Sequence, residues 1–191
     1  RLLFRLSNSS YKDKFVINST DDNKYVGELY DLGDELTINA NSSNATDEDK
    51  LKNKYLNSIK SDMSELYKEK REVQNSDLSK DEKYKKVQEI QRQINSLAKE
   101  GLDSYEDVIT TSNYSSVGSK EYYKTTEGEW YSINEDELAD INSMGMTTSE
   151  KNSYFGAKNN IYNIKDKYKD LLDTATEDEK AAAEKVAKEE A

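Results

Sequence analysis

The chain has 191 residues, of which 35% are charged and 34% hydrophobic, and it contains no cysteine, histidine or proline. The lack of cysteine and histidine excludes disulfides, thiolate nucleophiles, thiolate or imidazole metal sites and the histidine base of a catalytic triad. The formal net charge of -11 argues against binding to nucleic acid or to an anionic membrane, because both would repel the chain, and it favours a basic partner.

The two ends of the sequence predict that the chain is a fragment of a longer polypeptide. It begins at Arg1 without a methionine and stops at Ala191 within a helical pattern. We expect any enzymatic module to lie in other parts of that polypeptide. The absence of proline favours long, uninterrupted helices. No stretch approaches the roughly 18 consecutive apolar residues of a membrane span.

Residues 1–45 predict an N-terminal segment with one short helix. Thr20, followed by two aspartates, is typical of an N-cap, since the helix dipole favours acidic residues in the first turn. Apolar residues follow at helical spacing. Gly27 and Gly33 weaken this helix, and the asparagine-rich stretch 39–44 ends it.

Residues 46–102 predict an antiparallel helical hairpin, the strongest signal in the chain. Capping-box sequences begin at Thr46 and Ser79, and apolar residues recur at helical spacing behind each. The link of about four residues forces the two helices, over about 51–74 and 80–100, to run antiparallel. The seam is close to the 3.5-residue period of coiled coils, so it can close within one chain or between chains. The expected hairpin core is Leu56, Ile59, Met63, Leu66, Val87, Ile90, Ile94 and Leu97.

Residues 103–191 predict a connector, a small β-hairpin and further helices. Gly101, followed by a leucine, predicts the C-cap of the preceding helix. Residues 103–118 are rich in serine, threonine and asparagine and predict an irregular connector. Capping signals predict three helices, over 135–143, about 149–173 and 177–191. The expected core of the second is Tyr154, Phe155, Ile161, Ile164 and Leu171.

Residues 120–133 contain two aromatic, β-favouring runs around Glu127-Gly128 and predict the β-hairpin. With those two residues as the loop, Tyr123 lies opposite Ser132, and Tyr123 and Trp130 share one face. Such an aromatic group is a satellite core more often than a partner-binding hot spot. Tyr123 and Trp130 are nevertheless the candidate partner-binding residues. The other face is predicted to carry Tyr122, Tyr131 and Ile133.

Motifs that could carry chemistry have ordinary structural explanations. Tyr154 and Lys158 have the Tyr-x-x-x-Lys spacing of short-chain dehydrogenases, but the sequence lacks the glycine-rich turn that holds a dinucleotide. Four acidic clusters each lie in the first turn of a predicted helix, where the helix dipole explains them. They begin at Asp21, Asp47, Glu135 and Glu177. We expect no catalytic residue, cofactor or metal site; an enzyme using paired carboxylates or a bound divalent ion is an alternative.

Several runs of residues resemble a known family. The first two are Phe15-Val16-Ile17-Asn18 and Val26-Gly27-Glu28-Leu29-Tyr30-Asp31, followed by the charged hairpin. The later ones are Glu121-Tyr122-Tyr123-Lys124, Glu129-Trp130-Tyr131, Glu137-Leu138 and Gly145-Met146-Thr147, leading into Tyr154-Phe155. Together they are similar to the large polyvalent proteins of bacteriophages and conjugative elements. The resemblance implies a helical stretch of a very long polypeptide, packaged in the particle or delivered with the DNA, and it carries over no active-site residue.

We therefore expect a mainly α, non-enzymatic structural or interaction segment of a large phage or mobile-element protein. Its expected partners are other virion proteins or other parts of its own chain, without direct nucleic-acid binding. Its expected location is the virion, or the host bacterial cytoplasm after delivery. The alternative is a helical partner-binding region of an extracellular secreted or surface protein from an AT-rich Gram-positive bacterium. The sequence leaves the oligomeric state open.

Overall fold

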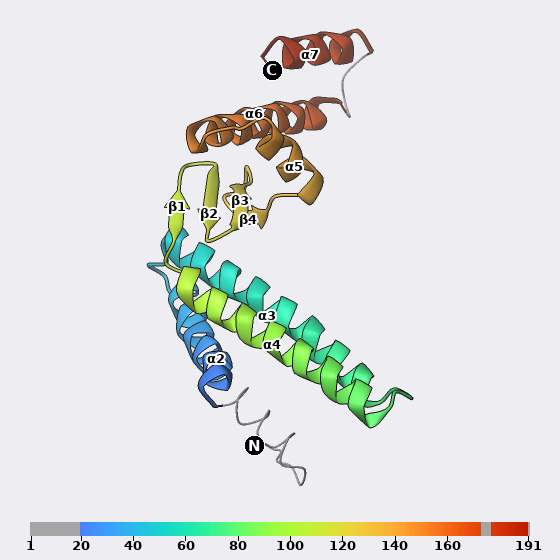
Figure 1. The fold of residues 1–191 in the computed structure, drawn as a ribbon. Coiled ribbons are helices and arrows are strands. Elements are labelled where there is room, and N and C mark those ends of the chain that lie inside the picture. The colour runs from blue at the N-terminus through green and yellow to red at the C-terminus, as the bar shows by residue number, and fades with distance from the viewer. Residues whose placement is uncertain (1–19, 173–176, 191) are drawn as a thin grey trace. The chain divides into compact units, whose positions relative to one another are not determined.

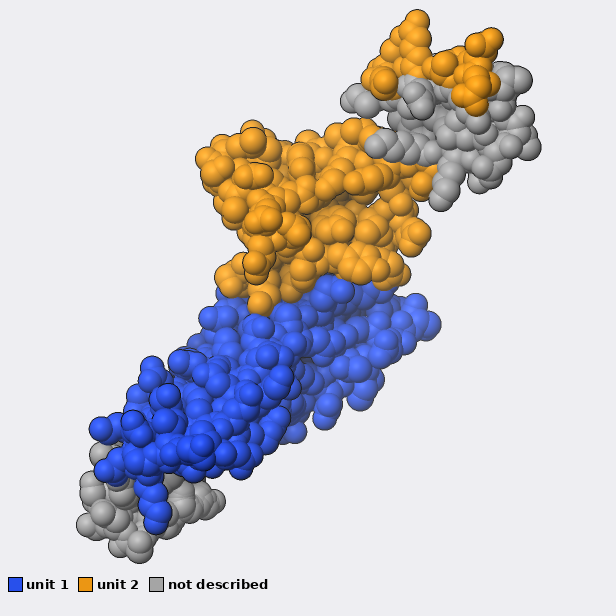
Figure 2. Space-filling model, turned by 90° about the vertical axis from the view of Figure 1, so that its right-hand side faces the viewer, with its two compact units in different colours: residues 1–107 blue, residues 108–191 orange. Residues whose placement is uncertain are grey.

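The computed structural model describes residues 20–172 and 177–190. The chain is mainly helical and has a small four-stranded antiparallel sheet, which confirms the predicted fold class (Figure 1). It divides into two compact units, residues 1–107 and residues 108–191 (Figure 2). Each unit has its own hydrophobic core.

The helices of the first unit are α2 (Thr20–Ala40), α3 (Asp47–Gln74) and α4 (Lys80–Ser104). α3 and α4 form the predicted antiparallel hairpin, and each begins at its predicted capping box (Figure 1). The Thr46 hydroxyl accepts from the backbone N–H of Asp49 at 3.1 Å, and the Asp49 carboxylate accepts from the N–H of Thr46 at 3.0 Å. Ser79 and Glu82 exchange the same two bonds. These bonds satisfy N–H groups that a helix leaves without partners at its start.

The core of this unit lies where the three helices meet. Five of the residues predicted for the hairpin core are buried: Leu56, Ile59, Met63, Ile90 and Ile94. The other three are only half-buried: Leu66, Val87 and Leu97. The unit also buries residues outside the predicted set: Leu29, Leu36, Leu51, Tyr55 and Ala98. The difference arises because α2 packs on the hairpin, so the buried stripe must serve two neighbours instead of one.

α2 begins at Thr20 and ends within the stretch 39–44, as the sequence predicts, although with 21 residues it is not short; it packs on both α3 and α4. The first unit therefore has no boundary at residue 45 and extends to residue 107. The prediction that Gly101 caps α4 is wrong, because α4 continues to Ser104. A Cβ atom added at Gly101 would lie 2.7 Å from Leu29 Cδ1, so the glycine allows the close approach of α2. Figure 1 shows the tip of the hairpin extending beyond α2.

The strands of the second unit lie in the order β1 (Val108–Thr110), β2 (Tyr114–Val117), β3 (Lys120–Lys124) and β4 (Trp130–Ser132). β3 and β4 are the predicted β-hairpin. The prediction of an irregular connector over 103–118 is wrong, because β1 and β2 lie within that range. Helix α6 (Thr148–Leu172) supports the turn between them. Asn152 Oδ1 accepts from the N–H of Asn113 at 2.8 Å and from the Thr111 hydroxyl at 2.9 Å.

The register of β3 against β4 differs by one residue from the prediction. Tyr123 lies opposite Tyr131 rather than the residue after it. The cause is the loop: the N–H of Thr125 donates to the carbonyl of Glu129 at 2.8 Å, so three residues connect the strands instead of two. Gly128 takes the φ of +87° that such a loop requires. A shift of one residue exchanges the faces of one strand relative to the other.

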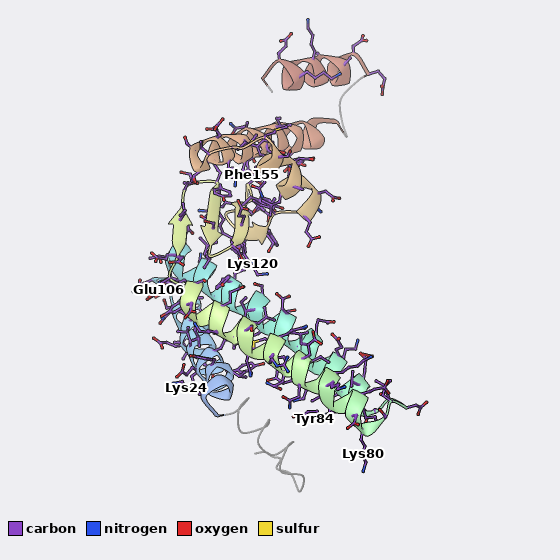
Figure 3. The ribbon with its side chains drawn as sticks, viewed as in Figure 1. Lys24, Lys80, Tyr84, Glu106, Lys120 and Phe155 are labelled. Atoms are coloured by element: carbon purple, nitrogen blue, oxygen red, sulfur yellow. The ribbon has the colours of Figure 1, made fainter. Side chains whose placement is uncertain are left out.

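Helices α5 (Glu135–Ser143), α6 and α7 (Glu177–Glu190) follow, close to the predicted ranges. One face of the sheet packs against α5 and α6 around Phe155 (Figure 3). The buried cluster consists of Tyr114, Ile133, Ile141 and Phe155, with Tyr123, Leu138, Met146 and Tyr154 partly buried around it. Of the other predicted core residues of α6, Ile161 is half-buried. The side chains of Ile164 and Leu171 lie outside the described part of the chain.

Candidate interaction surfaces

Tyr123 and Trp130, the predicted partner-binding pair, lie on opposite faces of the sheet. Tyr123 pairs with Tyr131, and Lys124 pairs with Trp130. Directly opposed residues point to the same face, so Tyr123 shares a face with Tyr131 and Trp130 shares the other with Tyr122. The prediction of one aromatic face that carries both Tyr123 and Trp130 is therefore wrong. Their role in partner binding stays a prediction.

Neither ring of this pair forms an open patch. The Tyr123 ring packs on Phe155 with centroids 5.4 Å apart. Trp130 is 3% exposed, and Lys124 Nζ lies 5.6 Å from its ring centroid. The residue that sequence reasoning missed is Tyr131, which is 51% exposed on the edge strand β4. The signal in the sequence is Gly128, because a three-residue hairpin loop commonly ends in a glycine. Such a loop places Tyr131 beside Tyr123.

A nearly buried ion pair joins the sheet to α6. Lys151 Nζ lies 2.6 Å from Glu121 Oε1, and the two side chains are only 12% and 14% exposed. The Tyr114 hydroxyl donates to the same Glu121 oxygen, and Lys151 also donates to Asn142 Oδ1 at 3.1 Å. Burial raises the pKa of Glu121, but the hydrogen bonds from Lys151 and Tyr114 lower it by a larger amount. The pKa of Glu121 therefore lies below that of an ordinary glutamate. Burial and the bond to Glu121 raise the pKa of Tyr114.

A second cluster of the same composition joins α5 to α6. Glu137 Oε2 accepts from the Tyr154 hydroxyl at 2.6 Å and from Lys158 Nζ at 2.7 Å. Burial raises the pKa of Glu137, but the hydrogen bonds from Lys158 and Tyr154 lower it by a larger amount. Its pKa therefore also lies below that of an ordinary glutamate. The bond to Glu137 raises the pKa of Tyr154. The Tyr-x-x-x-Lys spacing thus brings both side chains to one carboxylate, whereas a dehydrogenase tyrosine needs a lowered pKa.

The acidic clusters lie where the sequence predicts them, in the first turns of helices. Those beginning at Asp47 and Glu135 open α3 and α5, and the one beginning at Glu177 opens α7. The side chains of the cluster at Asp21 lie outside the described part. Among the described residues, no group of three or more acidic side chains is placed to hold a metal ion.

An open groove on the hairpin has a volume of about 520 Å³. It is lined by Leu66 of α3 and by Glu89, Arg92, Gln93, Ser96, Leu97 and Glu100 of α4. Leu66 and Leu97 are half-buried, and the polar lining residues are exposed. The two leucines belong to the predicted core, and they remain accessible because a pair of helices cannot enclose so wide an apolar stripe. An apolar floor with a polar rim is the composition of many protein–protein interfaces.

A row of polar side chains crosses the hairpin seam and contributes no residue to the lining of this groove. Lys70 Nζ donates to Gln91 Oε1 at 2.8 Å, and Gln91 Nε2 donates to Asn95 Oδ1 at 2.9 Å. Burial lowers the pKa of Lys70. Asn95 is 7% exposed. Buried polar residues in a helical seam fix the register of the two helices, at some cost in stability.

No helix in the described ranges is both long and apolar enough to cross a membrane. The features described above are a groove on the helical hairpin of the first unit and, in the second unit, an exposed tyrosine on the edge strand and two clusters of paired charges. Comparison with known protein families, with curated protein sequences and with solved structures finds nothing that matches this chain.

Proposed function

We propose that this chain is a non-enzymatic structural or interaction segment of a large phage or mobile-element protein. It contacts other virion proteins, or other parts of its own polypeptide, in the particle or in the bacterial cytoplasm after delivery. The observation that carries the proposal is the helical hairpin, in which helices of 28 and 25 residues present a groove with an apolar floor. Such a surface acts by shape and packing.

The ionic clusters of the second unit support the same proposal. Catalytic acids and bases need pKa values close to the working pH. The pKa values of Glu121 and Glu137 are instead lowered, and those of Tyr114 and Tyr154 are raised. These groups therefore keep one charge state near neutral pH. Each cluster contributes by holding α6 against the sheet or against α5.

Mass spectrometry of purified particles tests the proposal. We expect peptides of this chain in the particles, and we expect them to belong to a polypeptide much longer than 191 residues. Lysine-reactive cross-linking of the same particles then identifies the proteins that this chain contacts. Absence from particles, together with a short secreted parent, would contradict the proposal and favour the secreted or surface-protein alternative. A turnover that one carboxylate substitution in this chain abolishes would contradict its non-enzymatic part.

A further inference from the structure

We infer that the groove on the α3–α4 hairpin binds an amphipathic helix of a partner protein, one with leucine- or methionine-type side chains flanked by lysine or arginine. The inference rests on the proposed function, because it assigns a surface and a ligand chemistry to that interaction. The floor of the groove, its rim and the charge of the whole chain each carry one step of the argument.

The floor of the groove provides the apolar contact. Leu66 comes from α3 and Leu97 from α4, so the two side chains border the groove from different helices. Both are half-buried, which leaves apolar surface that a ligand can remove from water. Helices that bind in such grooves use apolar side chains at positions i, i+3 or i+4, and i+7.

The rim of the groove selects the charge of the ligand. Glu89 and Glu100 are both exposed on α4, and their positions place them three turns, about 16 Å, apart on one side of the helix. Arg92 is the one cation among the lining residues and lies one turn from Glu89. A helix with a lysine or arginine at each end of its apolar face can pair with both glutamates.

The charge of the whole chain disfavours a second copy as the occupant. Each copy carries a formal net charge of -11, so two copies repel each other at long range. The same charge attracts a basic partner and speeds its association. A basic helix of another protein therefore satisfies both the groove and the long-range field.

A peptide titration with the full chain tests this inference. The probe is a synthetic helix of about 18 residues with leucines on one face and a lysine at each end of that face, three turns apart. A matched peptide carries glutamates in place of the lysines. Binding is followed by fluorescence anisotropy, and methyl NMR locates the contact. We expect the lysine peptide to bind with shifts at Leu66 and Leu97, and the glutamate peptide to bind at least about tenfold more weakly.

Charge-reversed variants separate the groove from the general acidity of the chain. Glu89→Lys/Glu100→Lys should weaken the lysine peptide at least about tenfold and strengthen the glutamate peptide. Glu127→Lys/Glu129→Lys makes the same charge change at exposed positions on the β-hairpin loop and should leave both affinities within about twofold. All four positions are exposed, so folding should persist, and circular dichroism checks it.

Three results would overturn the inference. The first is equal binding of both peptides, and the second is equal loss in the two double variants. The third is a concentration-dependent dimer in sedimentation that Leu97→Asn abolishes, because a second copy would then occupy the groove. Cross-links that place particle proteins on another surface of this chain would overturn the inference and leave the proposed function standing. Absence of the chain from particles would contradict the proposed function. The peptide titration would still show whether the groove binds a basic amphipathic helix.

Discussion

Glycine positions show how single residues set the packing of the first unit. A Cβ atom at Gly101 would lie 2.7 Å from Leu29 Cδ1 and 3.4 Å from Ile59 Cγ2, whereas a Cβ atom at Gly27 would meet nothing within 4 Å. Alanine favours a helix over glycine by about 0.5–1 kcal/mol, but overpacking a core costs about 1–3 kcal/mol. Alanine should therefore destabilise the chain at Gly101, where it overpacks the core, and stabilise it at Gly27, where there is space for it.

We predict that Gly101→Ala lowers the free energy of unfolding by about 1–2 kcal/mol and that Gly27→Ala raises it by about 0.5–1 kcal/mol. Urea unfolding followed by circular dichroism at 222 nm measures both. Gly27→Ala is the matched control, because both glycines lie inside helices. If Gly101→Ala also stabilised the chain, α2 would not approach α4 as closely as the structure shows.

The Glu121–Lys151 pair makes the stability of the second unit depend on pH. The pKa of Glu121 in the folded chain lies below its ordinary value, so folding favours the charged carboxylate. The resulting stability is fully present above the pKa of an unfolded glutamate, about 4.3, and is lost as pH falls through the lower folded pKa. Glu137 has a lowered pKa as well and adds to the same acid-side loss.

We predict that Glu121→Gln destabilises the second unit by about 1–3 kcal/mol at pH 7 and flattens the decline of stability below about pH 5. Trp130 is the only tryptophan and is buried in that unit, so its fluorescence reports the transition. Glu189→Gln, also in the second unit, is the control: its pair with Lys185 is far more exposed and should change stability by less than about 1 kcal/mol. An unchanged acid profile in Glu121→Gln would show that the pair contributes nothing to folding.

At the scale of elements, helices could be predicted because their signals are local. The capping boxes at Thr46 and Ser79 and the cap at Asn134 need partners only two or three residues away, and all three begin helices in the structure. The strands β1 and β2 contain only three and four residues, so an alternating pattern has no room to appear. Their existence depends on pairing and on Asn152 of α6, which no local pattern reveals.

The candidate sites are less predictable than the helices, because their residues come from distant parts of the sequence and no local pattern joins them. The Tyr154 and Lys158 spacing predicts a shared helix face, but their common partner Glu137 lies on another helix. Glu121 and Lys151 meet across 30 positions of sequence. A two-residue loop would place Tyr123 and Trp130 on one face, but the loop has three residues, and its closing bond joins Thr125 to Glu129. For Leu97, periodicity identified an apolar position, but only the packing of three helices determines that it stays accessible.

The hairpin depends on the buried apolar residues that its two helices share. Ile90 lies in α4, is 5% exposed and belongs to the predicted seam. Replacing it with aspartate buries a charge without a partner, which costs more than about 3 kcal/mol. We predict that Ile90→Asp unfolds the first unit, with a large loss of ellipticity at 222 nm. Gln93→Asp, on the exposed side of the same helix, should retain nearly all of it. Little loss in Ile90→Asp would mean that the seam lies elsewhere.

At the scale of the whole molecule, the excess of acidic residues determines which partners the chain can approach. It has 39 aspartates and glutamates against 28 lysines and arginines. Several of the described lysines are already paired with acidic residues: Lys52 with Glu48, Lys99 with Asp103, Lys151 with Glu121 and Lys158 with Glu137. Pairing reduces the number of cations that could neutralise phosphates, so the long-range field and the local contacts act in the same direction.

We therefore predict no binding to a DNA duplex of about 30 base pairs at about 0.15 M salt, measured by fluorescence anisotropy. Lowering the salt should not induce binding, because weaker screening strengthens repulsion between two anions. Glu89→Lys/Glu100→Lys and Glu127→Lys/Glu129→Lys serve as controls, since both remain acidic overall and should behave alike. An affinity that falls linearly with log salt concentration would contradict the prediction. Because that slope measures the number of neutralised phosphates, it would reveal a local cationic surface strong enough to overcome the net charge of the chain.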